Sequence, residues 1–135
     1  MIRKVLLPAT ILLLAACNNS HSYKKAEDAE DAGREFIRAS LDGNYEKASF
    51  YLYADSTNKT MYAKWKKDYD RLSPDEQQKY RDASILPVDI HALNDSVTDF
   101  TYLNSYKKDT TTIRIIRVNG EWLVDLEEIL FHHRR

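Results

Sequence analysis

The sequence predicts an α+β fold, with N-terminal helices packed on a curved antiparallel β-sheet of about four strands. Three observations support this prediction. Apolar residues recur at three- and four-residue spacing up to about residue 83, which is typical of amphipathic helices. From Ser84 onward they alternate with polar residues, as in half-buried strands. Asn119-Gly120, between two strand-like segments, is a strong signal for a two-residue hairpin turn.

Two helices are expected before residue 54. Helical spacing covers about residues 26–41, and Gly43 tolerates the left-handed backbone that commonly ends a helix. Asn44 can then cap a second, short helix over 45–53, with Glu46 in its favourable first turn.

Two further helices are expected between residues 57 and 83. The third begins near Thr57 and carries one apolar stripe, formed by Met61, Tyr62, Trp65, Tyr69 and Leu72. The fourth begins at Ser73, because a Ser cap, Pro74 at the first helical position and Glu76 three residues after the cap form a helix-start signature. It is expected to end near Ala83.

Four strands are expected at about 85–92, 97–106, 110–118 and 121–126. The Asn119-Gly120 turn pairs the last two so that opposite residue numbers sum to 239, which places Arg114 opposite Asp125. One face of this hairpin then holds Ile113, Ile115, Arg117, Trp122, Val124 and Leu126. If residues 107–109 form a three-residue loop, Thr101 and Leu103 join that face, and Asp99 lies opposite Arg117 beside Trp122.

The first seventeen residues have the pattern of an export signal. Arg3 and Lys4 precede an apolar run over 5–14, which is about half as long as a bilayer core of about 30 Å requires of a spanning helix. Leu14-Ala15-Ala16-Cys17 resembles the lipobox of bacterial lipoproteins. The resemblance implies cleavage between Ala16 and Cys17 and attachment of diacylglycerol and an acyl chain such as palmitate to Cys17.

This pattern divides the chain into a signal peptide (1–16), a lipidated Cys17 with a polar tether (17–25) and a single α+β domain (26–135). Two or more acyl chains anchor a protein stably to a membrane. Asn18, the residue after the cysteine, resembles the signal for sorting to the outer membrane of Gram-negative bacteria. An ordinary secretory signal with a chance cysteine is the alternative.

Composition excludes several kinds of site. The net charge of −1 disfavours nucleic acid as a partner, and one cysteine excludes a disulfide framework. Three scattered glycines exclude a phosphate-cradling loop, so no cofactor is expected. His132-His133 and His21 do not have the spacing of a metal site, and none is expected.

Two motifs carry a resemblance over about residues 26–126. They are Asp42-Gly43-Asn44-Tyr45-Glu46-Lys47-Ala48 after the first helix and Asn119-Gly120-Glu121-Trp122-Leu123-Val124 in the last hairpin. With the lipobox, they make the chain similar to small bacterial lipoproteins that carry a nuclear transport factor 2-like (cystatin-like) domain of unknown function. The resemblance implies a cavity between the helices and the concave sheet, which in such folds serves isomerases, hydratases and non-catalytic binding domains alike.

The expected cavity suggests a set of candidate ligand-binding residues: Trp122, Arg117, Asp99, Trp65 and Tyr69. A carboxylate, a guanidinium and indole rings could together hold a polar ligand or orient a general base. The alternative is a structural ion pair at a strand end, with the arginine stacked on the tryptophan.

Asp89 and His91 share one face of the first strand at i, i+2 spacing. Asp99 and His91 are the weak catalytic candidates, and a solvated strand face is the simpler interpretation of the Asp89–His91 pattern. Three hypotheses follow. The first is a lipid-anchored envelope domain that binds a small molecule or a protein partner without catalysis. The others are an isomerase- or hydratase-like enzyme using the same cavity, and a structural component of an envelope assembly.

Overall fold

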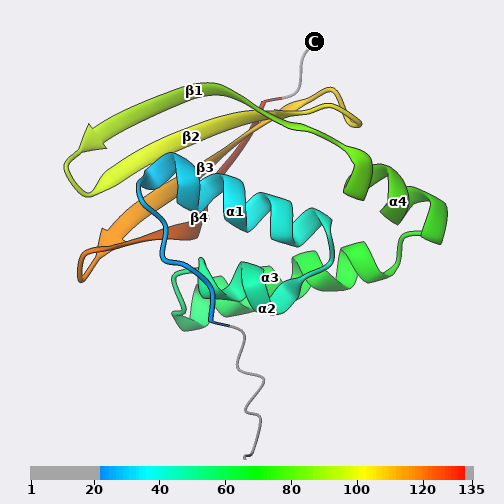
Figure 1. The fold of residues 1–135 in the computed structure, drawn as a ribbon, viewed down its shortest axis with the longest axis horizontal. Helices are drawn as coiled ribbons and strands as arrows, with labels where there is room; N and C mark the ends of the chain where they lie inside the picture. The colour runs from blue at the N-terminus through cyan, green and yellow to red at the C-terminus, as the bar shows by residue number, and fades with distance from the viewer. Residues whose placement is uncertain (1–21, 133–135) are drawn as a thin grey trace, which may run out of the picture.

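The computed structural model describes residues 22–132, with side chains as far as Glu127. Four helices precede four strands: α1 (Ala29–Leu41), α2 (Tyr45–Phe50), α3 (Ser56–Asp70), α4 (Pro74–Asp82), β1 (Ile85–Asn94), β2 (Val97–Asn104), β3 (Thr110–Val118) and β4 (Glu121–His132). The strands form one antiparallel sheet in the order β1-β2-β3-β4. The helices pack on one side of this curved sheet, with α1 lying across its face (Figure 1). The predicted fold class is confirmed.

Local side chains set the beginning of each helix. The Asp28 carboxylate accepts a hydrogen bond from the Asp31 N–H at 2.8 Å, so α1 begins at Ala29 and not at the expected residue 26. Asn44 caps α2 and Asp55 caps α3 in the same way. At α4 both halves of the predicted capping box, between Ser73 and Glu76, are formed.

The second helix is shorter than the expected 45–53. It ends at Phe50 because the next residues pair with the edge of the sheet. The Tyr53 N–H donates to the Val124 carbonyl at 2.9 Å, and the Val124 N–H donates to the Tyr51 carbonyl at 2.8 Å. These bonds form a short parallel bridge between Leu52 and Val124, which satisfies backbone groups that a helix would otherwise have used.

The expected register of the last hairpin is confirmed from Arg114 to Asp125. A register shift lies between Thr112 and Arg114, and β4 continues to His132, beyond the expected end at 126. Val118 lies opposite Glu121, Arg114 lies opposite Asp125, and Asn119 and Gly120 both have positive φ, as the expected turn requires.

The expected register between β2 and β3 is wrong. The loop is five residues long, over 105–109, and Asp99 consequently lies opposite Arg114 instead of Arg117. The Asn104 side chain causes this difference, because its Oδ1 accepts the N–H groups of Tyr106 and Lys107 and so begins the turn two residues earlier. The shift of three residues also reverses the faces of the strand. Phe100 and Tyr102, not Thr101 and Leu103, therefore point toward the helices.

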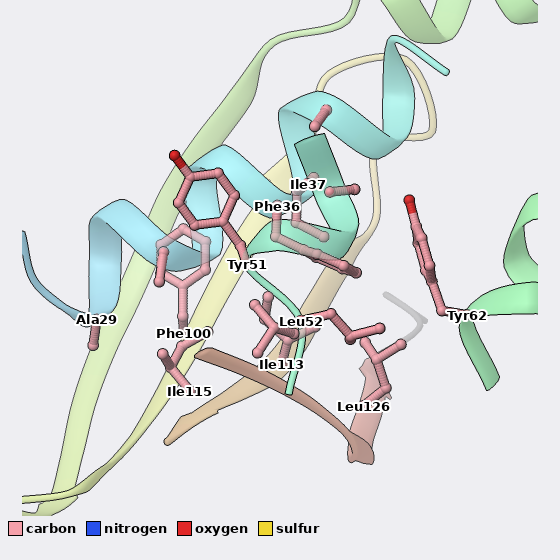
Figure 2. Packing of buried hydrophobic residues seen from close by; sticks show 14 of the residues in the cluster. Ala29, Phe36, Ile37, Tyr51, Leu52, Tyr62, Phe100, Ile113, Ile115 and Leu126 are labelled. Atoms are coloured by element: carbon pink, nitrogen blue, oxygen red, sulfur yellow. The ribbon is translucent and has the colours of Figure 1, made fainter. Parts of the chain in front are cut away.

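The core lies between α1 and the concave face of the sheet (Figure 2). Its largest fully buried side chains are Phe36, Phe100, Ile37, Ile113, Ile115, Leu126 and Val124. Gly33 lets α1 approach the sheet closely, since an added Cβ would lie 2.7 Å from Phe100 Cδ1. Every member of this buried cluster lies between Ala29 and Leu126, so a chain beginning at Asn18 keeps the whole core.

Candidate functional site

A pocket of about 250 Å³ lies where α1, α3 and α4 meet one end of the sheet. We call it the helix pocket. Six aromatic side chains line it: Tyr45, Tyr62, Trp65, Tyr69, Tyr80 and Tyr102. Ile37, Leu41 and Leu72 add apolar surface, and Ser40, Lys66 and Asp68 supply the other polar groups.

Helical spacing brings the α3 aromatics to the pocket. Trp65 and Tyr69 are four residues apart, so they lie on the same face of the helix. The Trp65 ring lies 5.9 Å from the Phe36 ring, between centroids, which ties the pocket wall to the core. The two α3 residues expected at the binding site are therefore both part of the helix pocket.

Hydroxyl groups around the pocket are bonded within the protein. Tyr69 Oη donates to the Leu41 carbonyl at 3.1 Å, and Tyr45 Oη donates to Asp70 Oδ1 at 3.0 Å. The Tyr62 and Ser40 hydroxyls share a hydrogen bond of 3.2 Å. The lining thus offers mainly the faces and edges of rings to a ligand.

The phenols of Tyr45, Tyr62 and Tyr102 stay neutral at physiological pH. Burial raises the pKa of Tyr102 to about 12, and it also raises the pKa values of Tyr45 and Tyr62 above the ordinary value of 10. Asp68 is the one carboxylate in the lining, and the lining includes no histidine. The pocket can bind an apolar group, and nothing in its lining resembles a paired acid and base.

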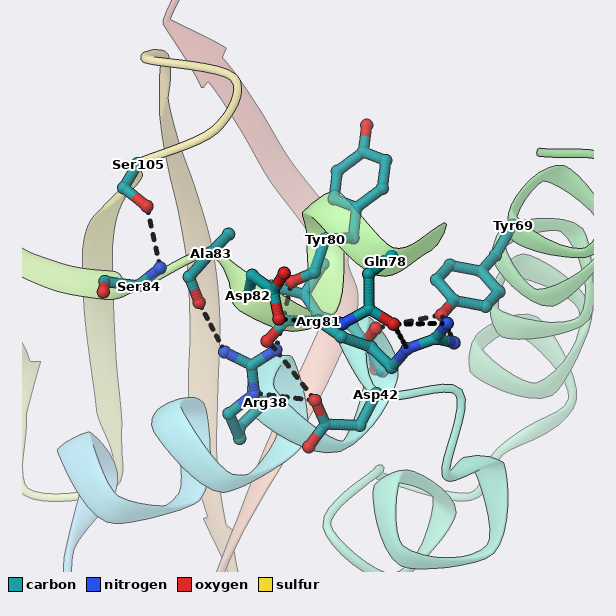
Figure 3. Close-up of polar contacts among 12 residues, drawn as sticks. Arg38, Asp42, Tyr69, Gln78, Tyr80, Arg81, Asp82, Ala83, Ser84 and Ser105 are labelled. Carbon is teal, nitrogen blue, oxygen red and sulfur yellow. Dashed lines mark hydrogen bonds and ion pairs between the residues drawn. The ribbon is translucent and has the colours of Figure 1, made fainter. Parts of the chain in front are cut away.

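Arg38 holds α4 against α1 and so completes the pocket wall (Figure 3). Its guanidinium donates to three carbonyls at the C-terminal end of α4: Ala83 at 2.6 Å, Tyr80 at 3.1 Å and Arg81 at 3.1 Å. Asp42 orients the same guanidinium from the other side at 2.9 Å. Because helix C-terminal carbonyls carry partial negative charge, a cation there is favourable. We call these three hydrogen bonds the Arg38 clamp. They fix the backbone that carries the Tyr80 ring.

Arg117 and Trp122 lie at the opposite end of the sheet. They are direct cross-strand neighbours, and the guanidinium carbon lies 5.5 Å from the centre of the indole ring. Arg117 lies six positions along β3 from Thr111, the neighbour of Tyr102, which corresponds to about 20 Å. The structure therefore separates this contact from Trp65 and Tyr69.

Asp99 lies neither in the helix pocket nor beside Arg117 and Trp122. It lies on the outer face of the sheet, away from the helices, and accepts a hydrogen bond from Arg114 Nε at 2.9 Å. His91 lies directly opposite Asp99 on β1, so the two weak catalytic candidates are neighbours, on the face away from the helix pocket. The expected cluster of Asp99, Arg117 and Trp122 is not formed, because it depended on the three-residue loop.

Four of the six aromatic residues of the pocket, Tyr45, Tyr62, Tyr80 and Tyr102, were not among the expected binding residues. Tyr80 falls on the fourth helix, where the alternating polar sequence gave no apolar stripe, and it reaches the pocket because of the Arg38 clamp. Tyr102 depended on the β2–β3 register. Its position between buried Phe100 and Asn104, at period two, is the signal that could have identified it.

The predicted lipidation residue Cys17 and the cleavage position after Ala16 lie outside the described residues. Over residues 22–132, no helix has the length and apolar character needed to cross a bilayer. The same part of the chain contains no group of three or more histidine, cysteine or acidic side chains arranged to hold a metal ion. Comparisons with models of known protein families, with curated proteins and with solved structures find no match to this chain.

Proposed function

We propose that this domain binds a small, uncharged, apolar or aromatic molecule in the helix pocket and does so without catalysis. One observation carries the proposal: six aromatic rings and three aliphatic side chains surround a space of about 250 Å³. Binding sites for drug-sized molecules have volumes of about 300–1,000 Å³. The pocket therefore suits a ligand smaller than a typical drug, with up to three rings or a short acyl chain.

The polar groups of the lining support an uncharged ligand. The Tyr69 hydroxyl already donates its hydrogen bond to the Leu41 carbonyl, and the Tyr45 hydroxyl donates to the Asp70 carboxylate. Lys66 lies 5.1 Å from the centre of the Tyr45 ring and 3.6 Å from Asp70, so its charge already has partners. A charged ligand would lose hydration without gaining a buried counter-charge.

The two tryptophans allow a direct test. Trp65 lines the pocket and Trp122 does not. The variant Trp122→Phe leaves Trp65 as the fluorescent reporter, and Trp65→Phe leaves Trp122; both conserve a large ring. We expect N-phenyl-1-naphthylamine, an uncharged aromatic probe, to quench the fluorescence of Trp122→Phe in a saturable manner. It should leave Trp65→Phe nearly unchanged. Equal quenching of the two variants would place the probe elsewhere, and no quenching in either would show that the probe does not bind. Either result would contradict the proposal.

We also propose that the chain is a lipid-anchored envelope protein of the nuclear transport factor 2-like group, placed at the outer membrane of a Gram-negative bacterium. The lipobox, Asn18 and the two motifs of the mature chain support this proposal. The α+β architecture is compatible with it. A binding domain at a membrane would meet apolar molecules that partition into lipid.

The anchor can be tested separately from the pocket. We expect the full chain to incorporate labelled palmitate and to fractionate with the outer membrane on a density gradient. Cys17→Ser should abolish the label and release the protein from that fraction. Ser22→Ala, a change in the same polar tether, is the control. Unlabelled protein that is nevertheless exported would indicate an ordinary secretory signal.

A further inference from the structure

The first strand of the sheet exposes an apolar edge. β1 pairs with β2 and with no other described strand. Four of its apolar side chains are 44–58% exposed: Leu86, Val88, Ile90 and Leu93. The edge strand of a sheet offers backbone N–H and C=O groups to another strand, and proteins usually protect such edges with charges, prolines or bulges.

Only the middle of β1 is regular enough to accept a partner strand. Register shifts lie between Pro87 and Asp89 and between Ala92 and Asn94. Pro87 also lacks an N–H to donate. The regular segment between these irregularities is Asp89–Ala92.

Within this segment, a carboxylate and an imidazole lie two residues apart. Asp89 lies opposite Thr101 and His91 lies opposite Asp99, so both side chains are on the outer face of the sheet. Ile90, between them, points to the face that carries the helices. All three are exposed. An acid and a base therefore flank a central apolar residue. When two copies of such a strand run antiparallel, the acid of each copy lies opposite the base of the other.

We propose that β1 pairs antiparallel with β1 of a second copy of this chain, around a two-fold axis at Ile90. In that register Asp89 lies opposite His91 of the second copy, and His91 lies opposite its Asp89. An imidazole donates an N–H to a carboxylate in either protonation state. An axis at Asp89 would oppose two carboxylates, and an axis at His91 would oppose Asp89 to Leu93. The axis at Ile90 therefore pairs both polar groups.

The outer face of the sheet supports this arrangement. Across the four strands, Asp125, Arg114, Asp99 and His91 form one row of directly opposite residues in which acids and bases alternate. The second copy's Asp89 continues the alternation beyond His91. On the other face, Ile90 meets its own copy and loses its exposure to water, which adds a hydrophobic contribution to the charge pairs. The helix pocket is not involved, so this proposal is independent of the proposed function.

Cysteine cross-linking tests the position of the axis. A chain beginning at Asn18 contains the whole core and no cysteine. In the variant Ile90→Cys, the two copies would have Cα atoms about 4.5–5.5 Å apart, within the range of a disulfide. The control is Leu86→Cys, on the same strand and equally exposed, 47% against 44%. Its two copies would lie about 26 Å apart.

We expect mild oxidation to link Ile90→Cys into a dimer and to leave Leu86→Cys monomeric at the same concentration. Equal cross-linking of the two variants would indicate random collision, and failure of Ile90→Cys to cross-link would exclude this axis. Either result overturns the proposal.

Charge reversal tests the pairing itself. The dissociation constant of the dimer, measured by sedimentation equilibrium, should rise about tenfold in Asp89→Lys, because the lysine of each copy then lies opposite His91 of the other. The double variant Asp89→Lys/His91→Asp exchanges the positions of the acid and the base and should restore the native value. The proposal is overturned if the unmodified chain is monomeric up to high concentration, if Asp89→Lys associates normally, or if the double variant is no better than the single one.

Discussion

Replacing Arg38 by alanine should release α4 from the rest of the domain. This helix buries no residue completely, so polar contacts make up much of its attachment. The Arg38 guanidinium donates hydrogen bonds to three carbonyls at the C-terminal end of α4: Ala83 at 2.6 Å, Tyr80 at 3.1 Å and Arg81 at 3.1 Å. In the variant the Ala83 and Arg81 carbonyls would turn to water, while the Tyr80 carbonyl keeps the Ala83 N–H at 3.3 Å.

The size of the effect follows from these contacts. A hydrogen bond to a charged donor contributes about 1.5–3 kcal/mol when buried. The Arg38 side chain is 32% exposed, and its Nη2 is shared among several acceptors, so we discount the total to about 2 kcal/mol. This corresponds to an about thirtyfold larger equilibrium constant for the opening of α4.

Native-state hydrogen exchange measures this opening directly. Amides of α4 should lose protection by that factor in Arg38→Ala, while amides of the central strands β2 and β3 change less. Arg34→Ala is the matched control on the same helix, because Arg34 is 59% exposed and reaches only Glu30, at 3.6 Å. Its effect should be confined to a few tenths of a kcal/mol.

The same pair of variants links stability to the pocket. Because Tyr80 belongs to both α4 and the pocket wall, Arg38→Ala should also weaken binding of N-phenyl-1-naphthylamine, and Arg34→Ala should not. If the two variants exchange their α4 amides at similar rates, the clamp contributes nothing and the reasoning is refuted.

Three further predictions concern the core, the sheet edge and pH. Gly33→Ala should lower the free energy of unfolding by about 1–3 kcal/mol, because the new Cβ overlaps Phe100; an unchanged urea midpoint would show that the ring moves freely. Asn58→Ala should lower the free energy of unfolding by about 1–3 kcal/mol, since the buried Leu126 N–H loses its 2.6 Å acceptor. Asn58→Asp keeps an acceptor; urea titrations of this variant should show a smaller loss of stability at acidic pH, where the new carboxyl is protonated, than at pH 7. Tyr102 has a raised folded-state pKa of about 12, so its contribution to stability is complete below pH 10 and declines between pH 10 and 12; Tyr102→Phe should show a weaker decline in that interval.

Most of the local structure follows from residues close together in the chain. Asn44 and Ser73 cap helices through bonds to backbone groups three residues away, and both were identified from sequence. Asn119-Gly120 adopts the positive φ values that its turn requires, so the pairing of the last hairpin was predicted correctly from Arg114 to Asp125. Such features are predictable because the interacting groups are connected by only a few bonds.

The β2–β3 loop shows where this reasoning ends. Lys108 has a φ of 57°, a conformation for which lysine gives no signal, and Asn104 begins the turn through its side chain. A different loop length reversed the faces of β2 and moved Asp99 away from Trp122. One unrecognised turn therefore changed the composition of the candidate site.

From the sequence alone, the order of the elements, the caps Asn44 and Ser73, the turn of the last hairpin and the α3 stripe with Trp65 and Tyr69 were determined, because each depends on neighbours in the chain. Only the tertiary structure decided the β2–β3 register, the clamp of Arg38 on α4 and the convergence of Tyr80 and Tyr102 on the same pocket. The clamp and the convergence of Tyr80 and Tyr102 join residues more than twenty positions apart, and the β2–β3 register pairs residues up to nineteen positions apart. Their formation depends on how the whole core packs, which no local pattern specifies.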